Sequence, residues 1–158
     1  MRLIYQNKNT KIKKTFTILY MIDINDAWYR VSAKALIYND KWQILLCKES
    51  NGTWDIPGGW LDHGENARDC IKRELIEEMW LEVTSISSSP VCFATASKES
   101  SKSRPWIWNI CYKVEVKNLD FSPSDECVEI GFFDNSTITN IKALINVVEV
   151  FKEIFSSK

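Results

Sequence analysis

Short apolar runs bounded by turn-forming residues recur along the chain, and this pattern predicts β-strands. Two of these runs, Arg30–Tyr38 and Trp42–Lys48, are separated by Asn39-Asp40, a pair that favours a hairpin-type turn. Later runs are expected to form strands as well, at Val91–Ala96, Trp106–Val116 and Glu129–Phe133.

Other segments show the spacing of amphipathic helices. Apolar residues recur every four positions at Ala67, Ile71, Leu75 and Met79, which predicts a helix with one face on the core. Asn66 is placed to cap the start of this helix, in a capping-box-like arrangement with Asp69. A second helix is expected near the C-terminus, where its apolar face is marked by Ile141, Leu144, Ile145, Val148, Phe151 and Phe155. Strands and helices in this order predict an α/β protein with a mixed sheet between helices.

The remaining segments carry weaker patterns. Met1–Lys14 is polar and basic, and Phe16–Ile24 is an apolar strand candidate, so residues 1–24 are expected to form an N-terminal extension or an extra strand. Ser97–Pro105 is a polar loop without an apolar anchor. Because no linker or repeat interrupts the chain, residues 1–158 are expected to form a single domain.

Composition narrows the class of protein. A chain of 158 residues with 45% apolar residues is long enough to bury a single core. A net charge of −1 argues against nucleic-acid binding as the main activity, because there is no basic excess to neutralise a phosphate backbone. The five cysteines form no C-x-x-C pair and no zinc spacing with His63, so they are expected to be reduced and mostly buried. No apolar run has membrane-spanning length, and the protein is expected to be cytoplasmic.

The helix predicted after Asn66 concentrates carboxylates. Glu74, Glu77 and Glu78 fall within an arc of about 100° on that helix. Carboxylates about 6 Å apart repel by roughly 1–3 kcal/mol for each pair, so the cluster favours a divalent cation. Carboxylates without histidine suit a hard cation such as Mg²⁺ or Mn²⁺. Arg73 is placed to pair with Glu65 or Glu74 and to hold the carboxylates in one orientation.

The segment Gly59–Leu81 reads GWLDHGENARDCIKRELIEEMWL and resembles the Nudix box, G-x5-E-x7-R-E-U-x-E-E-x-G-U, in which U is aliphatic. The matching positions are Gly59, Glu65, Arg73, Glu74, Leu75, Glu77, Glu78 and Leu81. Chance alone would give the strict part of this pattern less than about once in 10⁴ such chains, which disfavours the alternative of a merely solvated charged helix. The preceding segment, Trp54–Gly59, is similar to the strand and loop that lead into the box in that family.

The resemblance implies a Nudix-like α/β/α sandwich over about Arg30–Phe155 and hydrolysis of nucleoside diphosphates linked to another group. It implies that Mg²⁺ or Mn²⁺ is bound by Glu74, Glu77, Glu78 and the main-chain carbonyl of Gly59.

The resemblance also assigns roles around the cation. Arg73 and Glu65 would organise the box carboxylates. The general base in the family is either a box glutamate, here Glu77 or Glu78, or an acid from a later loop. Glu126 is the candidate in that loop and Glu129 comes after it, whereas the alternative for Ser124-Asp125-Glu126 is a capped surface turn.

Substrate preference is less constrained by the sequence. Trp60 follows the double glycine and is the candidate for stacking on a base. Family members acting on ADP-ribose or dinucleoside polyphosphates tend to have proline or tyrosine about fifteen residues after the box, where this chain has Ala96 and Ser97. A nucleoside triphosphate or a damaged nucleotide such as 8-oxo-dGTP is therefore the expected small-molecule partner. Nucleotide-sugar hydrolysis and a non-hydrolytic Nudix-fold binding module stay as alternatives, and a homodimer is left open.

One box position departs from the family. Trp80 replaces the glycine just past the helix, where the left-handed conformation is common and costs a non-glycine residue roughly 1–2 kcal/mol. We expect burial of the Trp80 indole to offset this strain, because tryptophan is highly buried on average.

Overall fold

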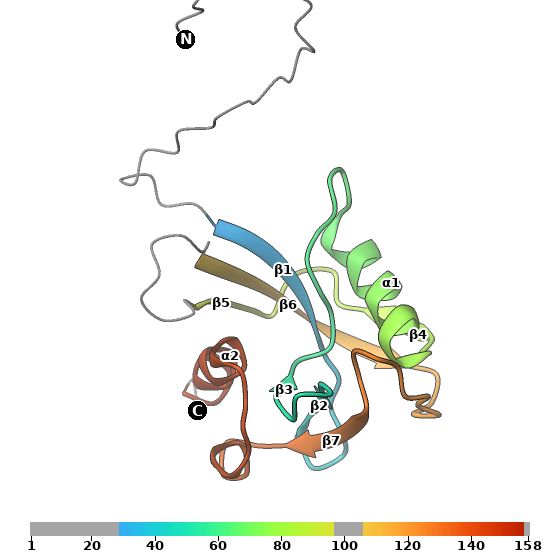
Figure 1. The fold of residues 1–158 in the computed structure, drawn as a ribbon. Helices are drawn as coiled ribbons and strands as arrows, with labels where there is room; N and C mark the ends of the chain where they lie inside the picture. The colour runs from blue at the N-terminus through green and yellow to red at the C-terminus, as the bar shows by residue number, and fades with distance from the viewer. Residues whose placement is uncertain (1–28, 97–105, 157–158) are drawn as a thin grey trace, which may run out of the picture.

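The computed structural model describes residues 29–96 and 106–156. The expectations for residues 1–24 and for Ser97–Pro105 lie outside this part of the chain. The strands, in chain order, are β1 (Tyr29–Leu36), β2 (Ile44–Lys48), β3 (Trp54–Asp55), β4 (Val83–Ile86), β5 (Cys92–Ala96), β6 (Trp106–Val116) and β7 (Glu129–Phe133). The helices are α1 (Ala67–Met79), the 3-10 helix η1 (Ile138–Asn140) and α2 (Ile145–Phe155) (Figure 1).

The strands form a mixed arrangement around β6. β1 pairs with β6 in parallel, and β4 and β5 pair with it antiparallel. A second sheet has the order β3-β2-β7 and is antiparallel throughout. The predicted turn between the first two strands is present, because the amide of Trp42 donates to the carbonyl of Asn39 at 3.0 Å. The strands that it joins nevertheless belong to different sheets, linked by an isolated bridge between Tyr38 and Ile44.

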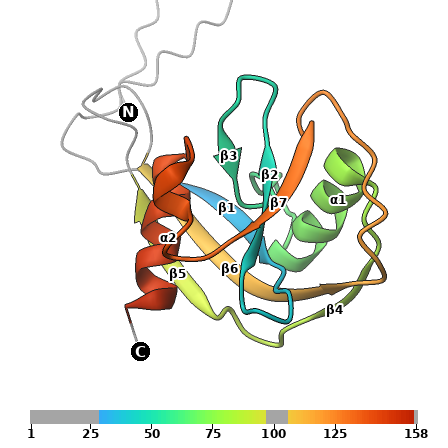
Figure 2. The same cartoon turned by 90° about the horizontal axis from the view of Figure 1, so that it is seen from below.

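Successive residues of β1 serve two hydrophobic cores, because side chains alternate between the faces of a strand. Ala33 and Ala35 pack with the apolar face of α1, whereas Leu36 packs with Val147 and Phe151 of α2. Figure 2 shows α1 and α2 on opposite sides of the strands. The predicted α/β/α sandwich with a mixed sheet between helices is therefore confirmed.

Differences from the sequence-based expectation are local. β6 and β7 have the predicted bounds, but α2 begins at Ile145 and not near Ile141, which follows η1. β4 was not expected at all. Its middle residues, Thr84 and Ser85, are exposed, and its pairing with β6 is irregular between Val83 and Ser85, so the segment lacks apolar alternation.

The structure bears on the cysteines and on membrane-spanning helices. All five cysteines are buried and free of disulfides, as predicted. Among the helices of the described residues, none is long and apolar enough to cross a membrane.

Candidate active site

The start of α1 is fixed by its cap. The side-chain oxygen of Asn66 accepts hydrogen bonds from the amides of Arg68 and Asp69, both at 3.1 Å, as expected for an N-cap. Asp69 accepts from the side-chain amide of Asn66 at 2.5 Å, so the reciprocal contact is made to the side chain of the cap. The buried face of α1, which includes Ile71 and Leu75, holds the helix against the core.

Arg73 gathers three carboxylates around one guanidinium group. Its Nε and Nη2 donate to the two oxygens of Glu65 at 2.9 and 3.0 Å, and its Nη1 donates to Glu74 at 2.8 Å and to Glu77 at 3.2 Å. The predicted pairing with Glu65 or Glu74 is thus present with both. Hydrogen bonds from Arg73 lower the pKa of Glu65 to about 2, and hydrogen bonding to Glu65 in turn raises the pKa of Arg73. This network fixes the orientation of the acids along the helix.

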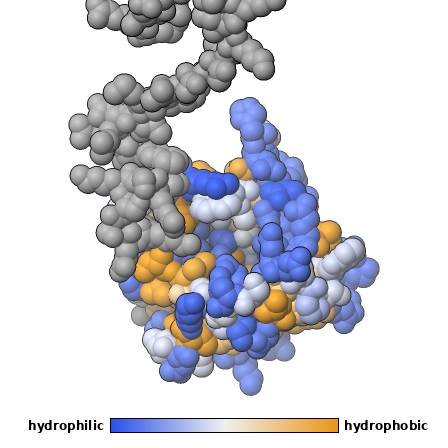
Figure 3. Space-filling view, viewed as in Figure 1, coloured by the Kyte–Doolittle hydropathy of each residue, from blue (hydrophilic) through white to orange (hydrophobic). Residues whose placement is uncertain are grey.

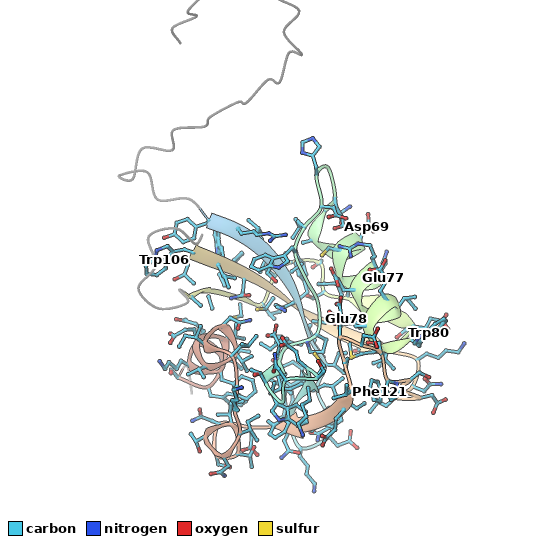
Figure 4. All side chains as sticks on the ribbon, viewed as in Figure 1. Asp69, Glu77, Glu78, Trp80, Trp106 and Phe121 are labelled. Carbon is cyan, nitrogen blue, oxygen red and sulfur yellow. The ribbon has the colours of Figure 1, made fainter. Side chains whose placement is uncertain are left out.

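The box acids divide between a cavity and the solvent. Glu74 and Glu78 line a cavity of about 310 Å³, and Glu126 of the turn before β7 lines it too. A neighbouring cavity of about 290 Å³ shares Asp55, Gly58, Glu78 and Glu126 with it. Glu77 lines neither cavity, and 60% of its side chain is exposed. Figure 3 shows the hydrophilic surface over α1 and its preceding loop, bordering a hollow beside the strands. In Figure 4, Glu78 lies on the side of α1 that faces the rest of the protein, whereas Trp80 points outward.

Glu78 is a largely buried carboxylate among other acidic side chains. Its Oε2 atom is buried and has no hydrogen-bond partner among the described residues. Burial raises the pKa of Glu78 to about 7, with Lys34 opposing the shift and the carboxylates of Glu74, Asp55 and Glu126 adding to it. Within the described ranges, no three His, Cys, Asp or Glu residues are already gathered as a metal cage. An orphaned carboxylate oxygen flanked by further carboxylates nevertheless fits a hard divalent cation.

Two glycines allow the loop before α1 to lie close to β1 and to Glu74. Gly58 has φ +112°, and a Cβ there would strike the carbonyl oxygen of Ala33. A Cβ on Gly59 would collide with the carboxyl group of Glu74. Side chains at these positions would push the loop away from β1 or displace the box acid.

The carbonyls of these glycines differ in their hydrogen bonding. The Gly59 oxygen accepts from the amide of Ala33 at 2.9 Å and from the hydroxyl of Ser32 at 3.1 Å. A carbonyl has two lone pairs, so a metal at Gly59 would compete with these bonds. The Gly58 oxygen accepts from Lys34 Nζ at 2.6 Å, and Gly58 lines both cavities beside Glu78. Gly58 is therefore a second main-chain candidate that the sequence reasoning missed.

The other predicted site residues differ in whether they line the cavity. Trp60 lines it, and the guanidinium of Arg30 lies 4.3 Å from the centre of the Trp60 ring. Glu126 lines both cavities, in a turn where Ser124 Oγ accepts from the amide of Glu126, so the capped-turn interpretation also holds. Glu129 pairs instead with Lys48 at 2.7 Å and lines neither cavity.

The sequence did not predict a polar cluster of Lys34, Asp55 and Asn146 in the lining of the cavity. Lys34 Nζ donates to Asp55 Oδ2 at 3.0 Å, and Asn146 Nδ2 donates to Asp55 Oδ1 at 2.9 Å. Burial alone would lower the pKa of Lys34, but neighbouring groups, Asp55 foremost, outweigh it and raise that pKa above its usual value. The sequence signal was a lysine inside the apolar run of β1.

Trp80 adopts the left-handed conformation expected of the glycine that it replaces, with φ 60° and ψ 26°. Its amide donates to the carbonyl of Ile76 at 3.1 Å, which closes the helix. The expectation of a buried indole is wrong, because Trp80 is 69% exposed. Leu81, whose amide donates to the Leu75 carbonyl, takes the fully buried position at the helix end.

The sequence matches a known family model and parts of two known proteins. A family model described as NUDIX domain matches residues 28–149. Over 65 residues the chain is 40% identical to an RNA pyrophosphohydrolase of Ruthia magnifica subsp. Calyptogena magnifica, covering 40% of this chain and 36% of that protein. Over 51 residues it is 41% identical to a putative 8-oxo-dGTP diphosphatase of Bacillus subtilis (strain 168), covering 32% of this chain and 34% of that protein.

These matches span about a third of the length of the curated relatives. The structural likeness extends further. The crystal structure of the MutT protein from Methanosarcina mazei Go1 superposes with a TM-score of 0.64 and 20% identity, covering 80% of this chain and 93% of that one. At this identity the likeness supports the fold.

Proposed function

The chain belongs to the Nudix family, and we propose that it hydrolyses the phosphoanhydride bond of a nucleoside diphosphate linked to another group, using Mg²⁺ or Mn²⁺. One observation carries the proposal, namely the unpartnered, buried Oε2 of Glu78 in a cavity that Glu74 and Glu126 also line. Burying an ionised carboxylate without a partner is costly, and a divalent cation would relieve that cost.

In this proposal Glu74 and Glu78, which line the cavity, hold the cation with a main-chain carbonyl of the double glycine. Glu77 lies outside the cavity and is a ligand only by the family resemblance. The family resemblance implies Gly59 for that carbonyl, and Gly58 is a second candidate, because its oxygen accepts from Lys34 whereas the Gly59 oxygen accepts from both Ala33 and Ser32. When bound, the cation supplies charge neutralisation on phosphate oxygens and a more acidic water.

The chain's own residues supply the remaining tasks. Arg73 holds Glu65, Glu74 and Glu77 through its fork of donors and so keeps their carboxylates oriented. The general base must lie within hydrogen-bond reach of the attacking water, and Glu126 offers a carboxylate from an element other than α1. Glu77 and Glu78 are the box alternatives for that role. Trp60 presents an aromatic ring to the same cavity for the base.

For the substrate we propose a nucleoside triphosphate or a damaged nucleotide. Two relatives, an RNA pyrophosphohydrolase and a putative 8-oxo-dGTP diphosphatase, support nucleotide pyrophosphate bonds as the target class. A nucleotide-sugar is the alternative substrate. The retained box acids favour hydrolysis over the non-hydrolytic binding module. The five free, buried cysteines support a reducing compartment such as the cytoplasm.

A release assay tests the proposal. Protein treated with EDTA is incubated with nucleoside triphosphates, 8-oxo-dGTP, ADP-ribose and a nucleotide-sugar, with and without added Mg²⁺ or Mn²⁺. Released pyrophosphate or phosphate is measured for the triphosphates. For ADP-ribose and the nucleotide-sugar, which yield phosphomonoesters, phosphate is measured after addition of a phosphatase. We expect turnover only with added metal, and highest for a triphosphate or 8-oxo-dGTP. Tight nucleotide binding without turnover under any condition would instead support the binding module.

A further inference from the structure

Lys34 is a buried cation in the lining of the acidic cavity. Its side chain is 5% exposed, and alternation along β1 puts it on the side that faces α2. Nζ donates to Asp55 Oδ2 at 3.0 Å, to the carbonyl of Ile56 at 3.0 Å and to the carbonyl of Gly58 at 2.6 Å. These contacts all go to one segment of four residues, Asp55–Gly58.

A lysine ammonium has three donors, and in Lys34 each donor has an acceptor. The residue therefore has no donor left for a phosphate, although it lines the cavity. Apart from its direct electrostatic effect on Glu78, Lys34 can act on the site only through the segment that it holds. This separates it from a substrate-binding lysine.

The Asp55–Gly58 segment is fitted tightly between β1 and the box. Gly58 approaches Ala33 so closely that a Cβ would clash, and the amide of Ala35 donates to the carbonyl of Pro57 at 2.8 Å. Lys34 fixes the direction of that carbonyl at the point where the chain enters the acidic cavity.

Asp55 extends the same network to the other side of the cavity. Its Oδ1 accepts from the side-chain amide of Asn146 in α2 at 2.9 Å and from the amide of Ile56 at 2.7 Å. Lys34, Asp55 and Asn146 thus connect β1, β3 and α2 along the lining of the cavity. Asn146 is also buried and lines the same cavity.

We propose that Lys34 is a positioning residue for the cation site. By binding Asp55, Ile56 and Gly58, it holds the segment before Gly59 so that the Gly58 carbonyl and the Glu78 carboxylate both face the cavity. The inference rests on the proposed function, since it assumes that a cation binds there. The rival explanation is that Lys34 only balances the buried charge of Asp55.

A pair of variants separates these explanations. Lys34→Met removes the ammonium group and leaves Asp55 charged, partly buried and without its ion-pair partner, which destabilises the protein under either explanation. Lys34→Met combined with Asp55→Asn also removes that charge and keeps an acceptor for Asn146. The double variant should recover much of the lost melting temperature, but it leaves the carbonyls of Ile56 and Gly58 unheld.

The readouts are Mn²⁺ affinity, measured by electron paramagnetic resonance, and kcat and KM for the best substrate. Loss of a residue that orients metal ligands typically weakens metal binding by about 10–100-fold. We expect a loss of that size in the double variant, with a fall in kcat and little change in KM. Val150→Ala, a buried truncation on α2, serves as the control that lowers stability without touching the cavity.

Wild-type Mn²⁺ affinity and kcat in the folded double variant would overturn the positioning role and leave charge balance as the explanation. If Lys34→Met alone does not fold, the double variant still decides. Wild-type protein that binds no Mn²⁺ would overturn the proposed function itself, and the inference with it.

Discussion

Arg73 meets Glu65 edge to edge, with Nε 2.9 Å from Oε1 and Nη2 3.0 Å from Oε2, while its remaining nitrogen reaches Glu74 at 2.8 Å. Two parallel hydrogen bonds to a carboxylate need the planar fork of a guanidinium group. The third contact shows that the same fork restrains an acid of the cavity. The geometry of Glu74 therefore depends on a residue that does not itself line the cavity.

Arg73→Lys should lower kcat by a similar factor, about tenfold or more, for every substrate, because an ammonium group cannot reproduce the fork. The measurement is kcat and KM over the substrate panel. Arg68→Lys is the matched control, since Arg68 lies on the same helix but donates to the carbonyls of Ser87 and Ser88. A loss confined to one nucleobase would mean that Arg73 contacts the base.

Gly59→Ala should weaken Mn²⁺ binding strongly while the protein still folds, because the new Cβ would displace the carboxyl group of Glu74. Calorimetric titration with Mn²⁺ and a thermal melt measure the two effects. Gly52→Ala is the control, because its φ of +81° adds strain but its Cβ would meet open space. Equal Mn²⁺ affinity in Gly59→Ala and wild type would remove Glu74 from the site.

Trp80→Gly should stabilise the protein by roughly 0.5–1 kcal/mol, since glycine relieves the left-handed strain while its extra unfolded-state entropy cancels part of the gain. The exposed indole offers little burial to lose. The expected rise in melting temperature is about 1–3 °C. Trp80→Ala removes the indole but keeps a Cβ, so it should give no rise. Loss of hydrolysis in a folded Trp80→Gly protein would place this tryptophan in the active site.

The sequence was informative where local chemistry decides the structure. The cap at Asn66, the apolar face of α1 and the bounds of β6 and β7 follow from residues close together in the chain. The pairing of Arg73 with Glu65 could be predicted too, because Glu65 lies just before the N-cap of α1 and Arg73 is eight positions further along, within that helix.

Features that depend on distant residues were missed. β4 is a strand only because β6 lies beside it, since its own Thr84 and Ser85 give no apolar alternation. The acceptors of Lys34 begin 21 positions along the chain, beyond any local pattern. The burial of Trp80 was predicted from an average for its residue type, whereas the turn after α1 placed Leu81 in the core instead.

The stability of the metal-free protein should depend on pH through Glu78. A carboxyl group whose pKa rises from 4.5 to about 7 on folding binds its proton more tightly in the folded state. Its contribution is therefore fully present below the unfolded value near 4.5 and is lost as the pH rises to about 7. The melting temperature of wild type minus that of Glu78→Gln should fall between about pH 5 and pH 8 in EDTA. A difference that stays constant over this range would show that Glu78 is not proton-linked to folding.

The most direct test of the metal-dependent hydrolase is turnover of the best nucleotide substrate by Glu78→Gln in Mg²⁺ or Mn²⁺. Glutamine removes the charge with little change in volume, so kcat should fall at least about a hundredfold while the fold is kept. Glu82→Gln is the control, because Glu82 is exposed and pairs with Lys117 at 2.9 Å, and it should retain wild-type kcat. Near-normal turnover by Glu78→Gln, or wild-type turnover that persists in EDTA, would contradict the assignment.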